Sequence, residues 1–194
     1  MRVLILTHPR SGGFSLLAWI SKELVLPSYH EPFLNHQHAQ THMESWSLKN
    51  IAVKEDISHL HQSHINVGQY LATFDRVILH VRRDTHAAAI SWVRQLETGE
   101  SHVVYSLDET WLSENSSKIS KKEMALRGIQ NAILWHGGEH VLTTSYEGIY
   151  HSGEDISRVC QYLGINDPQW LDVIDPRRRL QGGDPDLPPA VKKF

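Results

Sequence analysis

Cysteine is almost absent from this chain of 194 residues, and so is any large excess of charge of one sign. The single cysteine, Cys160, excludes an intramolecular disulfide framework and favours a reducing compartment. A net charge of −3 and a pI near 6.5 argue against the overall basic field of a nucleic-acid-binding domain. No apolar run reaches the roughly 18 residues that a membrane-spanning helix needs, and the chain begins with a strand pattern rather than a secretory signal. We therefore expect a soluble, cytoplasmic protein folded as one domain over residues 1–194.

Motifs that frame a metal site are also missing. The sequence contains no HExxH pattern and no paired cysteines, although it has 14 histidines. Several of these histidines gather in two polar segments, where nothing indicates tetrahedral ligation: His36, His38 and His42, and His59, His61 and His64. We predict no metal site and expect these imidazoles at the surface or lining a pocket.

The most informative stretch is the first one, RVLILTHPRSGGFSLLAWISKEL over residues 2–24. Residues 3–7 have the apolar, β-branched character of a buried parallel strand, the next six letters (HPRSGG) predict a turn, and helical spacing of apolar residues begins at Phe14. Such a turn points backbone N–H groups and the positive end of a helix at one place, which suits a phosphate or sulfate group. Arg10 adds a fixed positive charge there. Many α/β domains begin in this way without binding a ligand, so both interpretations stay open at this point.

A second motif with phosphate chemistry follows the strongest strand signal, RVILHV over residues 76–81. The sequence RRDTHAAAISWVRQ continues that strand into a helix, with Asp84 as its predicted N-cap. Arg83 stands at the strand end, and Ser91 follows eight residues later, about two turns into the helix. An arginine can hold a phosphate with two parallel hydrogen bonds, and a serine hydroxyl can donate to the same group.

Together, HPRSGG and RRDTHAAAIS resemble the two nucleotide-binding motifs of sulfotransferases: the 5′-phosphosulfate loop (PKSGTT or PRSGST) and the 3′-phosphate motif (RNPxDxxxS). The second is closest in style to RRDxxxQAVS of the bacterial trehalose-2-sulfotransferase-like and carbohydrate sulfotransferase branches. The family transfers a sulfuryl group from 3′-phosphoadenosine 5′-phosphosulfate (PAPS) and releases 3′-phosphoadenosine 5′-phosphate (PAP). The resemblance implies that Arg83 and Ser91 hold the 3′-phosphate, and that the 5′ side of the donor is bound by Arg10, Ser11, Gly12, Gly13, Phe14 and Ser15. The family usually has Ser or Thr at the positions of Gly13 and Phe14, so this turn offers fewer hydroxyl groups.

The resemblance also implies a proton acceptor. In the carbohydrate branches the glutamate of a Glu-Pro element is taken as the general base, and in SYHEPF, at the end of a predicted strand over residues 26–33, that glutamate is Glu31. A carboxylate at the carboxyl end of a parallel strand also lies where open α/β sheets bind ligands. The alternatives are that Glu31 is a solvated loop residue, and that His30 is the base, because the ordinary pKa of histidine suits this role better. Lys54 and Asp56 are further candidate contacts, and Asp56 is the next candidate base.

Two segments are expected to be irregular. Residues 98–118 are predicted to form a long loop or lid with a short element near Trp111, before a helix over 120–135 that begins at the capping box of Ser120 and Glu123. The basic, Gly- and Pro-rich tail over 175–194 resembles the C-terminal loop that closes over the 3′-phosphate in this family. By that resemblance the candidate donor contacts in the tail are Arg179, Gly182 and Gly183; a solvated basic tail is the alternative.

We therefore predict a three-layer α/β/α domain with a mostly parallel sheet of about five strands, the P-loop-like fold of sulfotransferases. The predicted function is transfer of a sulfuryl group from PAPS to a hydroxyl of a small-molecule acceptor such as a carbohydrate. Two other classes stay open. A nucleotide-binding phosphotransferase would need the Walker lysine of GxxxxGK[ST], and the sequence lacks that motif. A non-catalytic nucleotide-binding protein of the same fold is the other.

Overall fold

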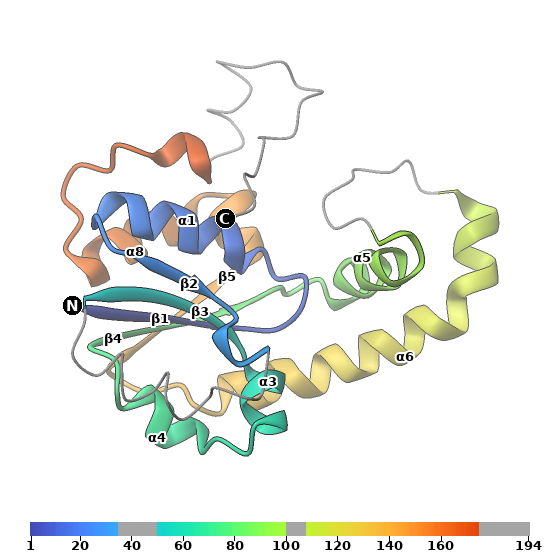
Figure 1. Cartoon of the computed structure of the whole chain (residues 1–194). Coiled ribbons are helices and arrows are strands. Elements are labelled where there is room, and N and C mark those ends of the chain that lie inside the picture. Colours follow the sequence, from blue (N-terminus) through green and yellow to red (C-terminus); the bar gives the residue numbers. More distant parts are fainter. Residues whose placement is uncertain (35–49, 100–107, 175–194) are drawn as a thin grey trace.

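The computed structural model describes residues 1–34, 50–99 and 108–174. Its centre is a sheet whose strands are ordered β2-β3-β1-β4-β5, every neighbouring pair being parallel (Figure 1). The strands are β1 (Arg2–Thr7), β2 (Ser28–His30), β3 (Ile51–Asp56), β4 (Arg76–Val81) and β5 (Val141–Ser145). The predicted parallel sheet of about five strands is confirmed in the described residues.

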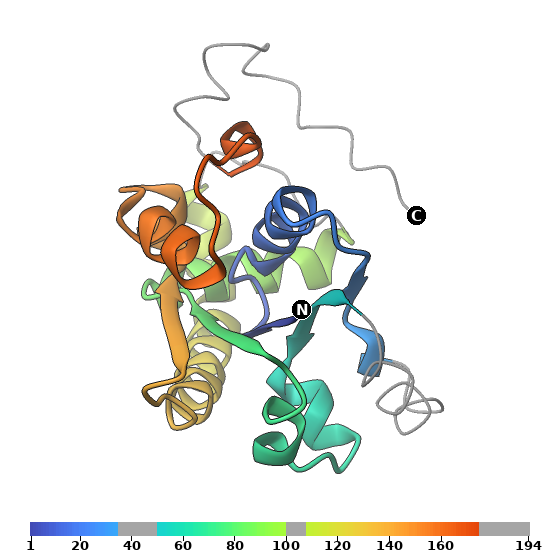
Figure 2. The same ribbon diagram turned by 90° about the vertical axis from the view of Figure 1, so that its left-hand side faces the viewer.

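Helices cover both faces of this sheet, as Figures 1 and 2 show. One face packs against α1 (Gly13–Glu23), α7 (Tyr146–Tyr150), α8 (Glu154–Leu163) and a 3-10 turn, η3 (Leu171–Val173). The other face packs against a second 3-10 turn, η1 (Pro32–Leu34), and against α3 (Ile57–Gln62), α4 (Val67–Leu71) and the C-terminal part of α6 (Glu109–Leu134).

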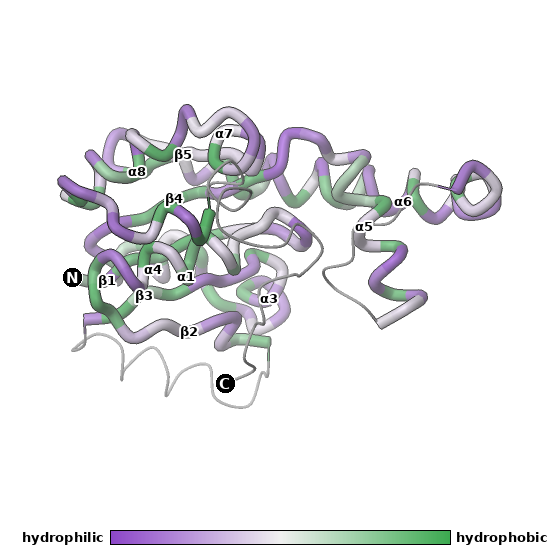
Figure 3. The backbone as a smooth tube through the Cα atoms, turned by 90° about the horizontal axis from the view of Figure 1, so that it is seen from above, coloured by the Kyte–Doolittle hydropathy of each residue, from purple (hydrophilic) through white to green (hydrophobic). Residues whose placement is uncertain are grey.

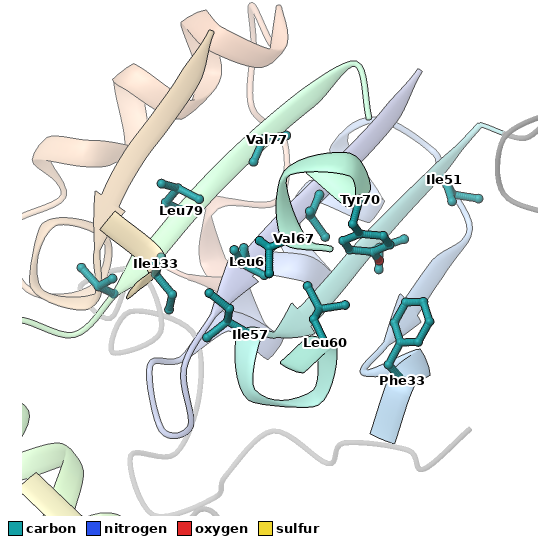
Figure 4. Packing of buried hydrophobic residues seen from close by; sticks show 13 residues of the cluster. Leu6, Phe33, Ile51, Ile57, Leu60, Val67, Tyr70, Val77, Leu79 and Ile133 are labelled. Carbon is teal, nitrogen blue, oxygen red and sulfur yellow. The ribbon is translucent and has the colours of Figure 1, made fainter. Parts of the chain in front are cut away.

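The core follows from the alternation of side chains along the buried strands. Val3 and Ile5 of β1 point into the cluster under α1, whereas Leu4 and Leu6 point into the opposite cluster. Figure 4 shows that opposite cluster, in which Leu6, Leu79 and Val77 of the strands meet side chains from α3, α4 and α6. Both faces of the sheet are buried, which explains why its strands read as nearly continuous apolar runs.

Two helices extend past the carboxyl edge of the sheet. Figures 1 and 3 show α5 (Thr85–Thr98) beside the first half of α6, forming an arm to one side of the sheet. Ala88, Ala89 and Val93 of α5 pack on Ile119 and Leu126 of α6 in a separate apolar cluster. The predicted N-cap of α5 is confirmed, because the Asp84 carboxylate accepts the Ala87 N–H at 2.8 Å. No helix in the described parts of the chain is both long and apolar enough to cross a membrane.

The start of α6 and the length of β2 were predicted wrongly. The long helix begins after its N-cap Asp108, so residues 109–118 are helical rather than a loop, and Ser120 lies inside the helix instead of capping it. Packing explains the difference: Asn115 and Ile119 are buried, whereas Ser113, Ser116 and Ser117 are exposed. The strand β2 ends at His30 rather than 33 because Glu31 adopts a left-handed conformation, with φ 49°.

Candidate functional site

The turn between β1 and α1 lies at the carboxyl edge of the sheet, where β1 has β3 on one side and β4 on the other. The chain passes from one side of β1 to the other after β3, and open α/β sheets bind ligands at such a switch point. The turn contains two residues in left-handed conformations, Arg10 (φ 64°) and Gly12 (φ 81°). Gly12 is the N-cap of α1 and has no side chain to accept the first helical N–H groups, so these groups face the edge of the sheet.

Ser11 gives this turn the character of an anion site. Its side chain is only 1% exposed, and its hydroxyl has no hydrogen-bond partner among the described residues. Buried polar atoms are almost always hydrogen-bonded, so an unpartnered hydroxyl beside a helix N-terminus fits a ligand with acceptor oxygens. A phosphate or sulfate group meets that description.

Close packing explains both glycines of the turn. A Cβ on Gly12 would lie 2.7 Å from the Tyr146 ring, and a Cβ on Gly13 would lie 2.6 Å from the Thr7 Cγ2 atom. The Lys54 side chain also passes beside Gly13, with its Cε atom 3.3 Å from that Cβ position. There is thus no room at position 13 for the hydroxyl residue that the resembled motif usually carries.

Arg10 joins the two predicted motifs. Its Nε donates to the Ser91 hydroxyl of α5 at 2.9 Å, and its Nη1 donates to the Gln95 side chain at 3.3 Å. Burial lowers the pKa of Arg10, and the neighbouring Arg82 charge lowers it further. Two guanidinium groups beside one turn form a strongly electropositive place, so an anion there would relieve their mutual repulsion.

Sequence reasoning overlooked Arg82. Its guanidinium stacks on the Tyr146 ring, 4.5 Å from the centroid, and donates to the Arg10 carbonyl at 3.4 Å. The doublet Arg82-Arg83 was the available signal, because adjacent residues at the end of a strand point to opposite sides. Only Arg83 matches the motif spacing, so the spacing does not identify Arg82.

Arg83 lies at the end of β4 as predicted, with its side chain 62% exposed and 3.4 Å from the Glu154 carboxylate of α8. The backbone N–H groups of Arg83 and Asp84 donate to the Glu147 carboxylate, each at 3.0 Å. Glu147 therefore fixes the backbone just after β4. Exposed ion pairs are worth little, so the Arg83 guanidinium can exchange Glu154 for a phosphate at small cost.

Glu31, His30 and Lys54 meet at the ends of β2 and β3. The buried Lys54 ammonium group donates to the Glu31 carboxylate, and the His30 Nε2 lies 3.7 Å from the same oxygen. Phe14, at the start of α1, packs edge-on against the His30 ring with centroids 5.0 Å apart. The structure thus brings the two candidate bases together beside the first turn of α1.

Both candidate bases are in the proton-accepting form at neutral pH. Burial alone would raise the pKa of Glu31, but the charge and hydrogen bond of Lys54 outweigh it and lower this pKa below its usual value. Burial lowers the pKa of His30, and the Lys54 charge lowers it further. An ionised carboxylate and a neutral imidazole therefore stand side by side.

Asp56, the third candidate base, is occupied as the N-cap of α3. Its Oδ1 accepts the Ser58 N–H at 3.0 Å and the Ser58 hydroxyl at 2.6 Å. The preceding Glu55 is fully buried and accepts the N–H groups of Phe33 and Asp56. These bonds fix the backbone around the site, so both carboxylates serve the local structure.

His80 is buried beneath the turn. Its Nε2 donates to the Ser11 carbonyl at 2.9 Å, and its Nδ1 lies 2.9 Å from the Thr144 hydroxyl. Burial lowers the pKa of His80 to about 4. At neutral pH the imidazole is therefore neutral, with one nitrogen donating and the other accepting.

This depressed pKa predicts a loss of stability in acid. In the unfolded chain His80 binds a proton below about pH 6.5, whereas in the folded chain its lowered pKa delays this until about pH 4. The contribution of neutral His80 to the free energy of unfolding is therefore complete above pH 6.5 and disappears as the pH falls to 4. The difference between the two pKa values corresponds to about 3 kcal/mol of unfolding free energy. Urea unfolding at pH 7.5 and 4.5 should show a smaller acid loss for His80→Gln than for the wild type. Equal losses would contradict this assignment.

Other predicted residues are only partly tested by the geometry. Arg179, Gly182 and Gly183 lie outside the described residues. Among the residues that are described, no three histidine, cysteine, aspartate or glutamate side chains converge as a metal-binding group. Cys160 packs at the edge of the cluster under α1, and burial raises the pKa of its thiol, in agreement with a structural role.

No family model and no curated protein sequence matches this chain. Solved structures that share its fold include two sulfotransferases. A mouse sulfotransferase, SULT7A1, complexed with PAP, aligns with a TM-score of 0.52 and 14% identity, over 89% of this chain and 62% of that one. The chain has a sulfotransferase fold. A sulfotransferase domain from the curacin biosynthetic pathway aligns with a TM-score of 0.51 and 14% identity, over 87% of this chain and 75% of that one. This chain thus spans less than two thirds of the length of the mouse enzyme, and at such identity the likeness concerns the fold.

Proposed function

We propose that this protein is a sulfotransferase that uses PAPS as the sulfuryl donor. The observation that carries the proposal is the turn before α1, which holds Arg10, an uncapped helix N-terminus and a buried Ser11 hydroxyl that has no partner among the described residues. The fold of this chain is shared with sulfotransferases, one of them in complex with PAP. A donor with a phosphosulfate at one end and a 3′-phosphate at the other would meet the Arg10 and Arg82 guanidinium groups beside the turn and the exposed Arg83 guanidinium after β4.

In this proposal the turn binds the 5′ side of the donor. The N–H groups of Gly12, Gly13, Phe14 and Ser15, with the Ser11 hydroxyl, would hold the phosphate oxygens. Arg83 and Ser91 would hold the 3′-phosphate, which distinguishes the donor from ATP. Ser91 accepts a hydrogen bond from Arg10 in the structure. One hydrogen bond would therefore link the groups that hold the 5′ side of the donor to those that hold its 3′-phosphate.

The reaction moves one proton and one sulfuryl group. The acceptor hydroxyl oxygen bonds to sulfur, the bond between sulfur and the bridging phosphate oxygen breaks, and PAP leaves with that electron pair. We propose that Glu31 takes the hydroxyl proton, with His30 as the competing acceptor beside it. Arg10 and Lys54 would stabilise the negative charge that grows on the bridging and equatorial oxygens.

The proposal is tested by calorimetry with PAP and ATP. PAP should bind more tightly, because only PAP carries the 3′-phosphate that Arg83 and Ser91 would hold. Equal binding of both nucleotides would favour a phosphotransferase. Binding of PAP without turnover in a screen of hydroxyl acceptors, carbohydrates included, would favour a non-catalytic nucleotide-binding protein.

Arg83→Ala should weaken PAP binding about 10- to 150-fold, which corresponds to the loss of a charged hydrogen-bonding partner of roughly 1.5–3 kcal/mol. Affinity for adenosine 5′-monophosphate, which lacks the 3′-phosphate, should hardly change. Glu154→Gln is the matched control, since it breaks the same exposed ion pair and leaves the guanidinium in place. Equal losses for both nucleotides in Arg83→Ala would remove this residue from the 3′-phosphate site.

A further inference from the structure

Each backbone carbonyl of the turn from Pro9 to Gly12 accepts a hydrogen bond from a side chain. The His8 Nδ1 donates to the Pro9 carbonyl at 2.8 Å, and the His80 Nε2 donates to the Ser11 carbonyl at 2.9 Å. The Arg82 Nη1 donates to the Arg10 carbonyl at 3.4 Å, and the Tyr150 hydroxyl donates to the Gly12 carbonyl at 2.7 Å. We call these four donors, His8, His80, Arg82 and Tyr150, the carbonyl anchors.

The hydrogen bonds to these carbonyls also determine the directions of the neighbouring backbone N–H groups. In a planar trans peptide the C=O and the N–H of the next residue point in opposite directions. Holding the four carbonyls therefore fixes the N–H groups of Arg10, Ser11, Gly12 and Gly13, each directed away from its own anchor. Successive N–H groups directed away from a protein wall form the concave anion sites called nests.

Three of the anchors lie outside the turn, and His8 belongs to the turn itself. His80 belongs to β4, Arg82 follows β4 directly and Tyr150 belongs to α7, so the sheet and one helix hold the turn together. The Tyr150 ring also approaches Gly12 closely, 2.9 Å from the position that a Cβ would take. This support maintains a backbone that contains Arg10 at positive φ, a conformation that L-residues rarely adopt unless their surroundings impose it.

Both histidine anchors use their two nitrogens. The His8 Nε2 accepts the Arg82 N–H at 2.9 Å while its Nδ1 donates to a carbonyl, which fixes the neutral tautomer. In His80 the donating nitrogen is Nε2, and the other nitrogen meets the Thr144 hydroxyl. Both histidines are fully buried, and their hydrogen bonds go to the carbonyls of the turn, the Arg82 N–H and Thr144, so we assign them a role through the backbone.

We propose that the four carbonyl anchors are positioning residues that preorganise the turn to bind a phosphate or sulfate group through its backbone N–H groups. The proposal deepens the proposed function and rests on it for the identity of the donor. The ligand that this proposal requires is a tetrahedral oxyanion rather than a whole nucleotide. Inorganic phosphate can supply this group as readily as PAP.

Tyr150→Phe is the sharpest test, because it removes one hydroxyl and keeps the ring that packs on Gly12. By calorimetry, the Kd for PAP should rise about three- to tenfold, as expected for the loss of one hydrogen bond. Tyr162→Phe is the matched control. Its hydroxyl also donates to a backbone carbonyl, that of His140 at 2.7 Å, but near the start of β5 at the opposite edge of the sheet. It should lose at least as much stability in urea, because the Tyr162 hydroxyl also accepts the Val77 N–H at 3.0 Å, and it should keep the wild-type Kd.

A second pair of variants tests the histidine anchor. His80→Leu removes the donor to the Ser11 carbonyl and should weaken PAP binding, whereas His80→Gln restores an N–H donor and should recover most of the affinity. An unchanged Kd in Tyr150→Phe, or an equal rise in Tyr162→Phe, would overturn the proposal. So would equal affinity in the two His80 variants.

Inorganic phosphate separates this proposal from the choice of donor. A wild-type protein that binds phosphate but not PAP would contradict the PAPS proposal. The Kd values of Tyr150→Phe and Tyr162→Phe for phosphate would still test the role of the carbonyl anchors. A wild-type protein that binds neither ligand would overturn both.

Discussion

Replacing Glu31 by glutamine is expected to lower turnover by about a hundredfold to ten-thousandfold and to leave PAP affinity nearly unchanged. A hydroxyl acceptor keeps its proton near neutral pH, so attack on sulfur needs a base within hydrogen-bond reach. Glutamine keeps the volume of Glu31 and can still accept a hydrogen bond from Lys54, but it cannot take a proton. Steady-state turnover and calorimetry on the same preparations provide the two measurements.

His30→Asn is the control for this substitution, because the two side chains lie 3.7 Å apart and share one environment. It should cost much less activity than Glu31→Gln. If the histidine variant is inactive and the glutamine variant active, the roles are reversed. Normal turnover in both would mean that neither residue is the base.

The pH profile of kcat/KM separates the same two residues without mutation. The lowered pKa of Glu31 keeps its carboxylate ionised until the pH falls below about 4.5, so a Glu31 base predicts a flat profile between pH 8 and 5. Burial and the Lys54 charge lower the pKa of His30 from the ordinary histidine value of 6.5, so a His30 base predicts an acidic limb below that pH. Loss of activity between pH 6.5 and 5 would therefore indicate His30. Stability must be measured alongside, because protonation of His80 acts in the same range.

The parallel sheet could be predicted because buried strands leave a strong local signal. The strand RVILHV coincides with β4 at both ends, and the turn after β1 was expected from its glycines. Buried on both faces, such strands are apolar at nearly every position, and no tertiary information is needed to find them. The order of the motifs along the chain then restricted the fold further.

The contacts within the site could not be predicted, because they depend on register and backbone conformation. Glu31 meets Lys54 because His30 pairs with Lys54 across β2 and β3 and because Glu31 itself turns left-handed. The carbonyl anchors come from residues far apart in sequence, such as Tyr150 and Gly12. The start of α6 was missed for a related reason, since the polar stretch before Ser120 becomes helical only through its packing against α5.

Arg10→Gly is expected to reduce turnover by about a hundredfold to a thousandfold, the usual effect of removing one donor that stabilises growing negative charge. PAP affinity should fall much less, because the charge on the bridging oxygen grows only as the bond to sulfur breaks. Glycine is chosen because Arg10 has φ 64°, a conformation that glycine adopts freely. Unfolding in urea should therefore show no large loss of stability, which separates a catalytic defect from a folding defect.

Two controls restrict what the Arg10 result can mean. Arg76→Ala removes the same charge at the opposite edge of the sheet, where the guanidinium bonds the Tyr162 carbonyl, and should leave turnover unchanged. Ser91→Ala removes the hydroxyl that Arg10 contacts at 2.9 Å and should weaken PAP binding more than it slows turnover, because we propose that Ser91 holds the 3′-phosphate. Normal turnover in Arg10→Gly would make Arg10 a structural link between the turn and α5. Similar losses in Arg10→Gly and Arg76→Ala would mean that net charge, rather than the position of this guanidinium, drives the effect.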